Sequence, residues 1–383
     1  MPMPPELEVR VVSRIAELLE QDWKSVFPQV LESYRFFKTL DESNLIQFSF
    51  FYVLVYDNGL PIGATSCFIM DFPIDIAAGS ALKGFLGFVR KIIPRIFTIK
   101  AMICGLPMGQ GRIGIIKDTE RVMGAMQRTF ERIAKEKKAP LMIFKDFNSS
   151  YDAMLKPLIR EGYLRMESFP STDMEVNFGS FEDYLKGLSP SSRENLRRNF
   201  KKIDGKVKIE LAVKNKLEGE ELAAVHALYL QTYNKQEMGL EKLTPDFFRR
   251  IAQNMPEETK FFLWKVEDKI AAFAFCLVSG DYFIDYYLGF DYAVAHRYFL
   301  YFMRFRGLLK WCIEHGIKTY EMGVTTYEPK KRLGFYFIRL YFYIKHRNKL
   351  INRFSGLLVH LLKPENFDAI FEHMDNAGSV RGA

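Results

Sequence analysis

The sequence contains few cysteines, and none of them stands close to another. Cys67, Cys104, Cys276 and Cys312 are the only four in 383 residues, and no CxxC motif occurs. Cys67, Cys276 and Cys312 lie within apolar runs, where a buried structural thiol is the usual role. The cysteines therefore predict neither a disulfide framework nor a zinc site, and we expect no bound metal.

Long apolar runs are also missing. A membrane-spanning helix needs a stretch of about 18 or more residues with few or no charges, and no such stretch occurs. The first ten residues, MPMPPELEVR, lack the apolar segment of a signal peptide. We therefore expect a cytoplasmic protein. A GxSxG elbow, a Walker loop and an HExxH motif are absent too, which excludes the enzyme classes that depend on them.

Basic and aromatic residues are abundant. Lysine and arginine outnumber aspartate and glutamate by 54 to 46, and phenylalanine and tyrosine number 35 and 19. The net charge of +8 favours an anionic partner, which could be a nucleic acid, a lipid headgroup layer or a phosphorylated cofactor. Aromatic residues in such numbers line cores, apolar ligand channels and membrane interfaces. The chain length suits two domains of similar size.

The pattern of expected strands and helices occurs twice along the chain. The first copy has strands at 48–56 and 62–70, a helix at 119–137, and strands at 141–147 and 174–178. The second copy has strands at 261–266, 270–279 and 282–290, a helix at 296–315 and a strand at 318–322. Asn58-Gly59 between the first two strands is typical of a hairpin turn. The segment before Leu40 has helical spacing at Val12, Ile15, Leu18 and Leu19. We therefore predict an α+β (α/β) fold with a duplicated unit, divided at residues 1–178 and 179–383.

The first copy carries about 30 more residues than the second between its hairpin and its helix, near 75–105. Apolar residues in this insertion recur at three- and four-residue steps, as on one helical face: Leu82, Phe85, Leu86, Val89, Ile92, Ile93 and Ile96. The charges between them are all basic. A basic amphipathic helix of this kind lies in a bilayer interface. The alternative is a helix that packs on the core and has a solvated polar side.

The C-terminal segment has a similar character. No acidic residue occurs from Phe335 to Lys363, where aromatic and aliphatic residues alternate with arginine, lysine and histidine. The first part alternates like a strand, and Leu350 to Leu362 has helical spacing. Nucleic-acid binding is one explanation for basic and aromatic residues together. The apolar positions are mostly aliphatic or clustered, which favours burial or contact with the inner face of the cell membrane.

A helix that begins at Ser189-Pro190 carries five basic residues, Arg193, Arg197, Arg198, Lys201 and Lys202. Arg193 and Arg197 share a face at an i,i+4 spacing. Paired guanidinium groups suit phosphate oxygens, so this helix is a candidate phosphate clamp. The alternative is an ordinary solvated basic face.

Two motifs of the second half resemble a known family. Residues 181–185 (FEDYL) and 188–193 (LSPSSR), with the basic helix, are similar to the opening of the acyltransferase domain in the Fem-like and BioF2-like, peptidoglycan-biosynthesis-like branch of the GNAT superfamily. Residues 320–323 (YEMG) and 327–335 (YEPKKRLGF) resemble the ending of that domain. The resemblance covers about 180–343, and the first half follows it only in the order of its elements.

This resemblance implies tandem GNAT-like folds, each with a mixed, mostly antiparallel sheet flanked by helices. Such enzymes move an acyl group from a CoA thioester, or an aminoacyl group from a charged tRNA, onto an amine. One departure concerns the loop that holds the CoA pyrophosphate on backbone amides, because residues 291–297 (DYAVAHR) contain no glycine. The glycines at 109–114 (GQGRIG) have a different spacing. Acyl-CoA is therefore expected as a co-substrate, with no permanently bound cofactor.

The attacking amine must lose a proton, so a general base is required. Candidates at strand ends in the second copy are Asp285 and Glu321, and His296 precedes a helix. Burial would raise the pKa of Glu321 towards a useful value.

Two further groups of candidates complete the expected site. Arg297 and Lys330, with Arg193 and Arg197, are candidates for binding the donor phosphates. Tyr287 and Tyr327 are candidates for the substrate site.

We therefore expect an acyl-CoA-dependent N-acyltransferase whose acceptor is the amine of a membrane-associated molecule. A long-chain (sphingoid) base fits the basic aromatic surfaces best, which would make the protein similar to a bacterial ceramide-synthase-like acyltransferase. One alternative is a Fem-like aminoacyl transfer to a cell-wall precursor, with charged tRNA as the only nucleic-acid partner. The other is a catalytically inactive GNAT pair that binds a membrane.

Overall fold

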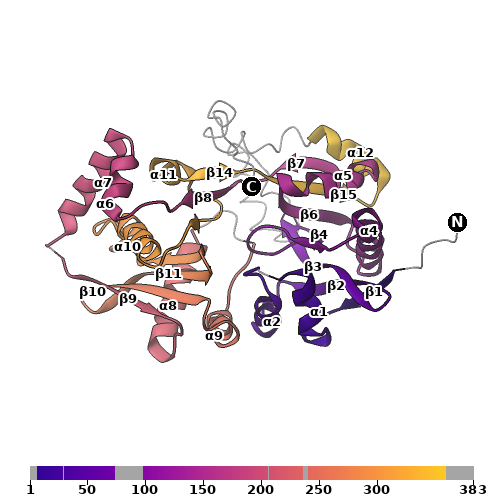
Figure 1. Cartoon of the computed structure of the whole chain (residues 1–383), viewed down its shortest axis with the longest axis horizontal. Helices are drawn as coiled ribbons and strands as arrows, with labels where there is room; N and C mark the ends of the chain where they lie inside the picture. Colours follow the sequence, from indigo (N-terminus) through magenta and orange to yellow (C-terminus); the bar gives the residue numbers. More distant parts are fainter. Residues whose placement is uncertain (1–6, 29, 74–97, 206, 236–239, 359–383) are drawn as a thin grey trace, which may run out of the picture. The chain divides into compact units, whose positions relative to one another are not determined.

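The computed structural model describes residues 7–28, 30–73, 98–205, 207–235 and 240–358, with only the backbone for 355–358. Two compact units make up this part of the chain (Figure 1). Unit 1 falls within Met1–Gln29, Leu45–Pro170 and Arg339–Ala383, and unit 2 within Val30–Asn44 and Ser171–Ile338. The predicted division into 1–178 and 179–383 differs from these units in three segments, because Val30–Asn44 and 171–178 fall in unit 2 and Arg339–Ala383 falls in unit 1.

Unit 1 is built on one sheet. Its strands, in spatial order, are β1 (Glu8–Val12), β2 (Ser49–Asp57), β3 (Leu60–Pro73), β4 (Thr98–Cys104), β6 (Leu141–Asn148), β15 (Leu340–His346) and β7 (Leu164–Glu167). The short strand β5 (Ile113–Ile115) pairs with β3. Neighbouring strands are antiparallel except β4 and β6, which are parallel.

Helices pack on both faces of this sheet. They are α1 (Glu20–Val26), α4 (Thr119–Glu136), α5 (Asp152–Arg160) and α12 (Lys349–Leu358), with single turns of 3₁₀ helix at Ile15–Glu17 and Ser149–Tyr151. The α4 helix buries Met126 and Phe130 in a cluster with Val53 and Phe144. Trp23 of α1 packs its ring against Tyr52, whose position alternates with that of Val53 and so faces the other side.

Unit 2 is built on a second sheet with the same arrangement. Its strands, in spatial order, are β9 (Ile209–Lys214), β10 (Thr259–Val266), β11 (Lys269–Ser279), β12 (Tyr282–Phe290), β13 (Thr319–Glu321), β8 (Ser171–Glu175) and β14 (Tyr336–Ile338). Only β12 and β13 are parallel. In both sheets, the one parallel pair is therefore formed by the fourth and fifth strands in spatial order, and all other neighbours are antiparallel.

Seven helices of the described residues belong to unit 2: α2 (Tyr34–Glu42), α6 (Phe181–Gly187), α7 (Pro190–Ile203), α8 (Gly219–Tyr233), α9 (Pro245–Asn254), α10 (Leu300–Glu314) and α11 (Tyr327–Arg332). Alternate residues of β10 face different helices. Phe262 belongs to the cluster of α6, α7 and α10, whereas Phe261 contacts Phe248 of α9.

The predicted fold class is confirmed, and so are most of the predicted elements. Both hairpins turn through two residues of positive φ, Asn58 (51°) and Gly59 (78°) in unit 1, and Glu267 (49°) and Asp268 (65°) in unit 2. This is the backbone that a two-residue hairpin turn requires. The Ser189 side chain caps α7, and Pro190 is its first residue, as predicted.

Two predicted elements differ from the structure, and part of a third lies outside the described residues. The helix predicted before Leu40 is wrong at its start, because Val12 ends strand β1. The strand predicted at 174–178 is β8 (Ser171–Glu175), and it joins the sheet of unit 2. Within the predicted insertion, 98–104 forms β4, and the amphipathic segment 82–96 lies outside the described residues. No helix in the described part of the chain is long and apolar enough to cross a membrane.

One strand of each sheet comes from the opposite half of the sequence. β8 follows the elements of unit 1 along the chain but pairs with β13 and β14 of unit 2. β15 follows the elements of unit 2 but pairs with β6 and β7 of unit 1. Neither half of the sequence therefore contains a complete sheet.

Candidate active site in unit 2

Strands β12 and β13 run side by side for three residues and then part. Residues 282–284 pair with Thr319–Glu321, where β13 ends, while β12 continues to Phe290. Among the described strands, residues 285–290 have a neighbour on one side only, which is β11. Backbone groups on the other side of β12 can bind an extended ligand as an added strand would be bound.

Two buried carboxyl groups face each other where the strands part. Asp173 of β8 and Glu321 of β13 are directly paired across the antiparallel strands, and they are 6% and 3% exposed. The Ser171 hydroxyl donates a hydrogen bond of 2.9 Å to Oε1 of Glu321, and the Tyr282 hydroxyl donates one to Oε2. Oδ1 of Asp173 is buried and accepts no hydrogen bond from the described residues.

This environment changes the protonation of the pair. Burial, and then repulsion by the Glu321 carboxylate, raises the pKa of Asp173 to about 8. Asp173 is therefore mostly protonated at neutral pH. A carboxyl group whose pKa lies this close to neutral pH can give or take a proton under physiological conditions.

Acidic and tyrosine side chains continue along the same face of the sheet. A bulge shifts the pairing of β11 with β12, so the adjacent rings of Tyr286 and Tyr287 both stack on Phe275. The Tyr286 hydroxyl donates to Glu32 and the Tyr287 hydroxyl donates to Glu241, each at 2.7 Å. Tyr287, predicted to bind substrate, is thus close to a carboxylate on this face.

Asp285 lies on the opposite face, against α10. It forms a fully buried ion pair with Arg304 and accepts a hydrogen bond of 3.2 Å from the Tyr320 hydroxyl. Asp285 supplies the counter-charge of a fully buried guanidinium, which would otherwise be uncompensated. This environment gives Asp285 a structural role instead of the predicted role of a base.

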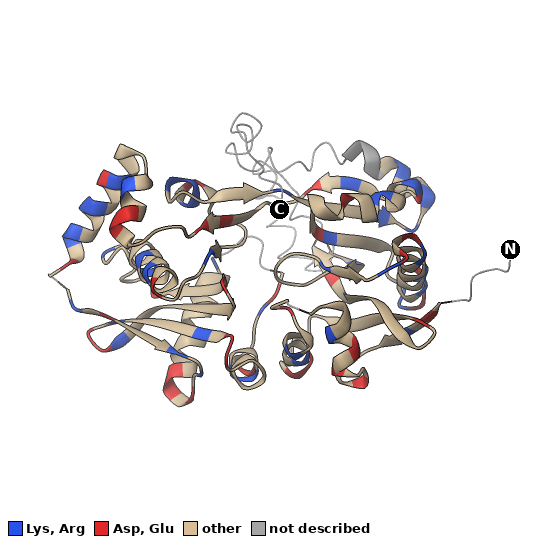
Figure 2. Ribbon diagram, viewed as in Figure 1, with Lys and Arg blue, Asp and Glu red and all other residues tan. Residues whose placement is uncertain are grey.

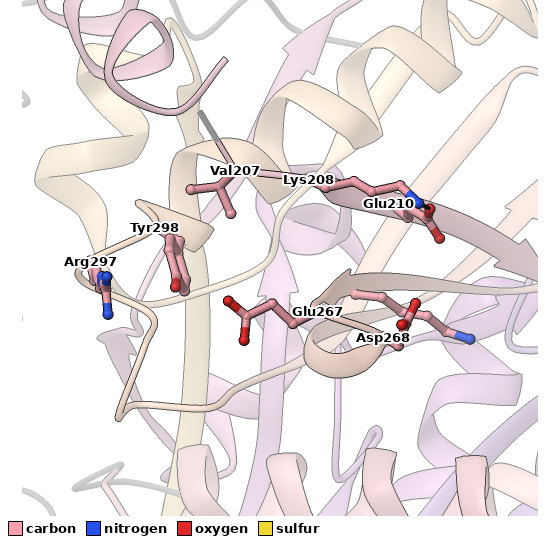
Figure 3. Close-up of a pocket in the computed structure, with 8 residues that line it drawn as sticks. Val207, Lys208, Glu210, Glu267, Asp268, Arg297 and Tyr298 are labelled. Atoms are coloured by element: carbon pink, nitrogen blue, oxygen red, sulfur yellow. Dashed lines mark ion pairs between the residues drawn. The ribbon is translucent and has the colours of Figure 1, made fainter. Parts of the chain in front are cut away.

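His296 and Arg297 are exposed in the loop between β12 and α10. The His296 ring lies 6.3 Å from the Phe299 ring, and the structure does not bring it to Glu321 or Asp285. Arg297 lines a hollow of about 430 Å³ (Figure 3). Its charged lining is mixed, with Lys208, Lys265 and Arg297 against Glu210, Glu267 and Asp268. Because these charges balance, the hollow does not favour a polyphosphate.

The backbone of this loop is largely occupied by its own hydrogen bonds. The amides of Ala293, Val294 and Ala295 all donate to Asp291, the first to its side chain and the others to its carbonyl. The amides of residues 298–300 donate to carbonyls within the loop. A nest of amides for a pyrophosphate needs N–H groups that point outward. The structure thus provides a physical reason for the missing glycines.

The arginines of the predicted clamp contact protein groups. Arg193 donates a hydrogen bond of 3.2 Å to the Lys186 carbonyl, and Arg197 pairs with Glu182, so both connect α7 to α6. The other end of α7 approaches the loop before α10, because the Lys202 ammonium lies 5.2 Å from the centre of the Phe299 ring. Figure 2 shows basic residues along the exposed side of α7. The clamp remains a prediction.

Lys330 anchors the loop that follows β13. Its buried ammonium donates to the carbonyls of Met322, Gly323 and Val324 at 2.8, 3.0 and 3.1 Å, and burial lowers its pKa to about 7. All three donors are therefore used, which gives Lys330 a different role from the predicted phosphate contact. Two residues of this loop, Thr325 and Thr326, have positive φ values of 70° and 55°, a strained backbone for β-branched residues.

The buried ring of Tyr327, the second predicted substrate residue, packs against Phe337 at 5.7 Å and lies beside the Lys330 ammonium. The structure therefore brings Tyr287 and Glu321 to one face of the sheet and places Tyr327 in the core of the adjacent loop.

The sequence alone did not single out Asp173, Ser171, Tyr282 or Glu32. The pattern of alternation in STDMEV indicates a strand with Asp173 on one face, but its partner is about 150 residues away. Only the pairing of β8 with β13 brings the two carboxyl groups together.

The two units and the order of their strands define the class of the chain as a tandem GNAT-like fold. A family model named FemAB-like, described as peptidoglycan biosynthesis/recognition, matches residues 107–354. The chain therefore belongs to the FemAB-like family. A comparison with curated protein sequences finds no match.

Solved structures share this fold at low sequence identity. FemX is similar with a TM-score of 0.55 and 12% identity, covering 90% of this chain and 99% of its own. A tandem GNAT protein from the clavulanic acid biosynthesis pathway is similar with a TM-score of 0.54 and 9% identity, covering 90% and 99%. L-PGS from Bacillus licheniformis has a TM-score of 0.51 and 13% identity, covering 86% and 95%. These similarities support the fold of each unit, and the FemAB-like model supports the family.

Proposed function

We propose that this protein transfers an acyl group from an activated, phosphate-bearing carrier to an amine. The observation that carries the proposal is the pair of Asp173 and Glu321, buried where β12 and β13 part. A strand edge that can bind an extended donor by hydrogen bonds thus lies next to a group that can accept a proton. An amine attack on an activated carbonyl requires these two components.

In the proposed reaction the acceptor arrives as an ammonium ion and gives a proton to Glu321. The neutral amine then attacks the carbonyl carbon of the donor, which lies along the edge of β12. The new C–N bond forms as the bond to the carrier breaks, and the leaving thiolate or alkoxide takes up a proton. Protonated Asp173 next to Glu321 gives its proton to the leaving group, and the proton that the nitrogen loses as the amide forms restores Asp173. Glu321 then releases the first proton to solvent, which returns the pair to its starting state.

The acceptor is proposed to be cationic and amphiphilic. The buried carboxylates of Glu32 and Glu321 lie on one face of the sheet with Tyr282 and Tyr286, and an acidic, aromatic cluster of this kind attracts an ammonium group. The amine of a long-chain base has this chemistry together with an apolar tail. The protein would then act from the cytoplasmic side of the membrane.

Two carriers share the chemistry of the proposed donor. Acyl-CoA is the first, in keeping with the GNAT fold. Charged tRNA is the second, and it is favoured by the exposed basic side of α7 and by the occupied amides of the loop before α10. Release of free CoA thiol from acyl-CoA, or of uncharged tRNA from aminoacyl-tRNA, in the presence of a long-chain amine distinguishes the two.

The test of the site is Glu321→Gln, with Glu314→Gln at the exposed end of α10 as the matched control. General-base catalysis contributes about 10²–10⁴-fold, so kcat should fall by that factor in the first variant and stay unchanged in the second. Full activity in Glu321→Gln would refute the proposed base. Binding of the amine without turnover on either donor would instead identify a binding module.

A further inference from the structure

Exposed apolar side chains gather on unit 1 at α12 and the end of α5. Leu350, Ile351 and Phe354 of α12 are 70%, 48% and 64% exposed, and Ile159 of α5 is 47% exposed. The two helices are tied together, because Asn352 donates a hydrogen bond of 2.9 Å to the carbonyl of Gly162, just after α5. We call these four apolar residues the α12 surface.

The charges around the α12 surface are mainly basic. Arg347, Lys349 and Arg353 are exposed on or next to α12, and Lys156 and Arg160 are exposed on α5. Glu161 is the one acidic residue of 153–163, and 335–363 contains none. An apolar centre surrounded by lysine and arginine has the composition of a helix that lies in a bilayer interface.

This combination distinguishes a lipid surface from other partners. Aliphatic side chains such as Leu350 and Ile351 provide no platform on which a base could stack, which weighs against a nucleic acid. A second copy would bring two basic surfaces together, and like charges repel. An anionic leaflet instead attracts each basic residue and accepts the apolar side chains below its headgroups.

We propose that the α12 surface docks onto an anionic lipid bilayer. Leu350, Ile351, Phe354 and Ile159 enter the headgroup boundary, and the basic residues contact lipid phosphates. The surface belongs to unit 1, whereas the proposed active site belongs to unit 2. Docking therefore does not depend on the proposed chemistry, and a vesicle assay measures it without any turnover.

The experiment uses the full chain and co-sedimentation with vesicles of phosphatidylglycerol or of phosphatidylcholine. Wild-type protein should bind the anionic vesicles and bind the neutral ones far less. Leu350→Ser with Phe354→Ser should weaken binding to the anionic vesicles by about tenfold or more, since two apolar side chains are removed from the interface. The matched control, Ile46→Ser with Leu60→Ser, replaces side chains that are 95% and 65% exposed elsewhere on unit 1 and should bind like the wild type.

A second variant tests the charges, with Lys349→Gln and Arg353→Gln. Its binding should fall by about 25-fold, because each of the two basic residues near an anionic surface contributes on the order of fivefold. Binding that is unchanged in both double variants would overturn the proposal, and so would equal binding to the two kinds of vesicle. Self-association of the wild type that Phe354→Ser abolishes, without vesicle binding, would identify a second copy as the partner instead.

Discussion

Asp173 combines burial with an acidic neighbour, and this combination makes stability depend on pH. Its pKa is about 8 in the folded protein and near 4 in an unfolded chain. The stabilisation that the bound proton provides is complete below pH 4 and is lost as the pH rises through 8. The free energy of unfolding of the wild type, relative to Asp173→Asn, should therefore fall by about 1 kcal/mol per pH unit in this window. Urea denaturation at pH 5, 7 and 9 measures it.

Asp204→Asn is the control for this prediction. Asp204 pairs with Arg306, which lowers its pKa, so its contribution to stability should disappear only as the pH falls below the ordinary pKa of an aspartate, near 4. A wild-type protein whose stability relative to Asp173→Asn is the same at pH 5 and pH 9 would contradict the assigned pKa.

The buried pair of Asp285 and Arg304 leads to a prediction about folding. Asp285→Asn leaves a fully buried guanidinium without its counter-charge and should destabilise the protein by about 3–5 kcal/mol. Asp285→Asn combined with Arg304→Met should recover much of this loss, because the uncompensated charge is gone. Thermal or urea unfolding measures both. A double variant no more stable than the single one would show that Asp285 stabilises the fold in another way.

The sequence predicted a site residue correctly only where its position along a strand was enough to show that it is buried. Glu321 was predicted because it ends a buried strand, and the structure buries it as expected. The roles of Asp285 and Lys330 were not predictable in this way, since each depends on a partner in another element. Arg304 lies on α10, and the carbonyls that hold Lys330 belong to a loop whose path is not encoded in local spacing.

At the scale of elements, the hairpin turn of unit 1 depends on a single glycine. Gly59 has a φ of 78°, and a side chain there would meet no atom within 4 Å. Gly59→Ala should therefore cost about 1–2 kcal/mol from backbone strain alone. Gly187→Ala is the control, because this glycine in α6 also has open space but no positive φ. Unfolding free energies of the two variants test this, and equal values would contradict it.

Local pattern predicted the hairpins and long helices well, because their turns and caps lie within the element itself. It failed at the start of the segment before Leu40, where Val12, Ile15 and Leu19 have helical spacing, although α1 and α2 follow as helices. Val12 instead belongs to β1, which extends the sheet next to β2. A short strand at the edge of a sheet gains its stability from pairing with its neighbour. The spacing of apolar residues within the segment contains no information about that pairing.

At the scale of the whole molecule, the sheet of unit 1 depends on β15. A chain that ends at residue 338 lacks this strand and leaves β6 and β7 with unpaired edges, which favours aggregation. A chain that ends at residue 358 keeps β15. The shorter chain should therefore be insoluble or unfold without cooperativity, and the longer one should unfold like the full protein. Size-exclusion chromatography and thermal unfolding compare them, and a soluble, cooperative shorter chain would contradict this role of β15.

The duplication was visible in the sequence, but the exchange of strands was not. Both β8 and β15 have the alternation of an ordinary strand, and nothing in either segment specifies which sheet it joins. The predicted division at residue 178 assigned β8 to the first domain and β15 to the second, as their positions along the chain suggest. Pairing partners that are far apart along the chain determined the actual units instead.

The exchange of strands also orders events during synthesis. The first unit emerges from the ribosome long before Leu340–His346 is made, so its sheet waits with β6 and β7 apart until nearly the whole chain has been translated. Domains that fold one after another during translation escape such a delay. For this protein, we expect the nascent first half to remain open to chaperones and proteases while the second half is made, so that translation speed through the second half affects the yield of folded protein.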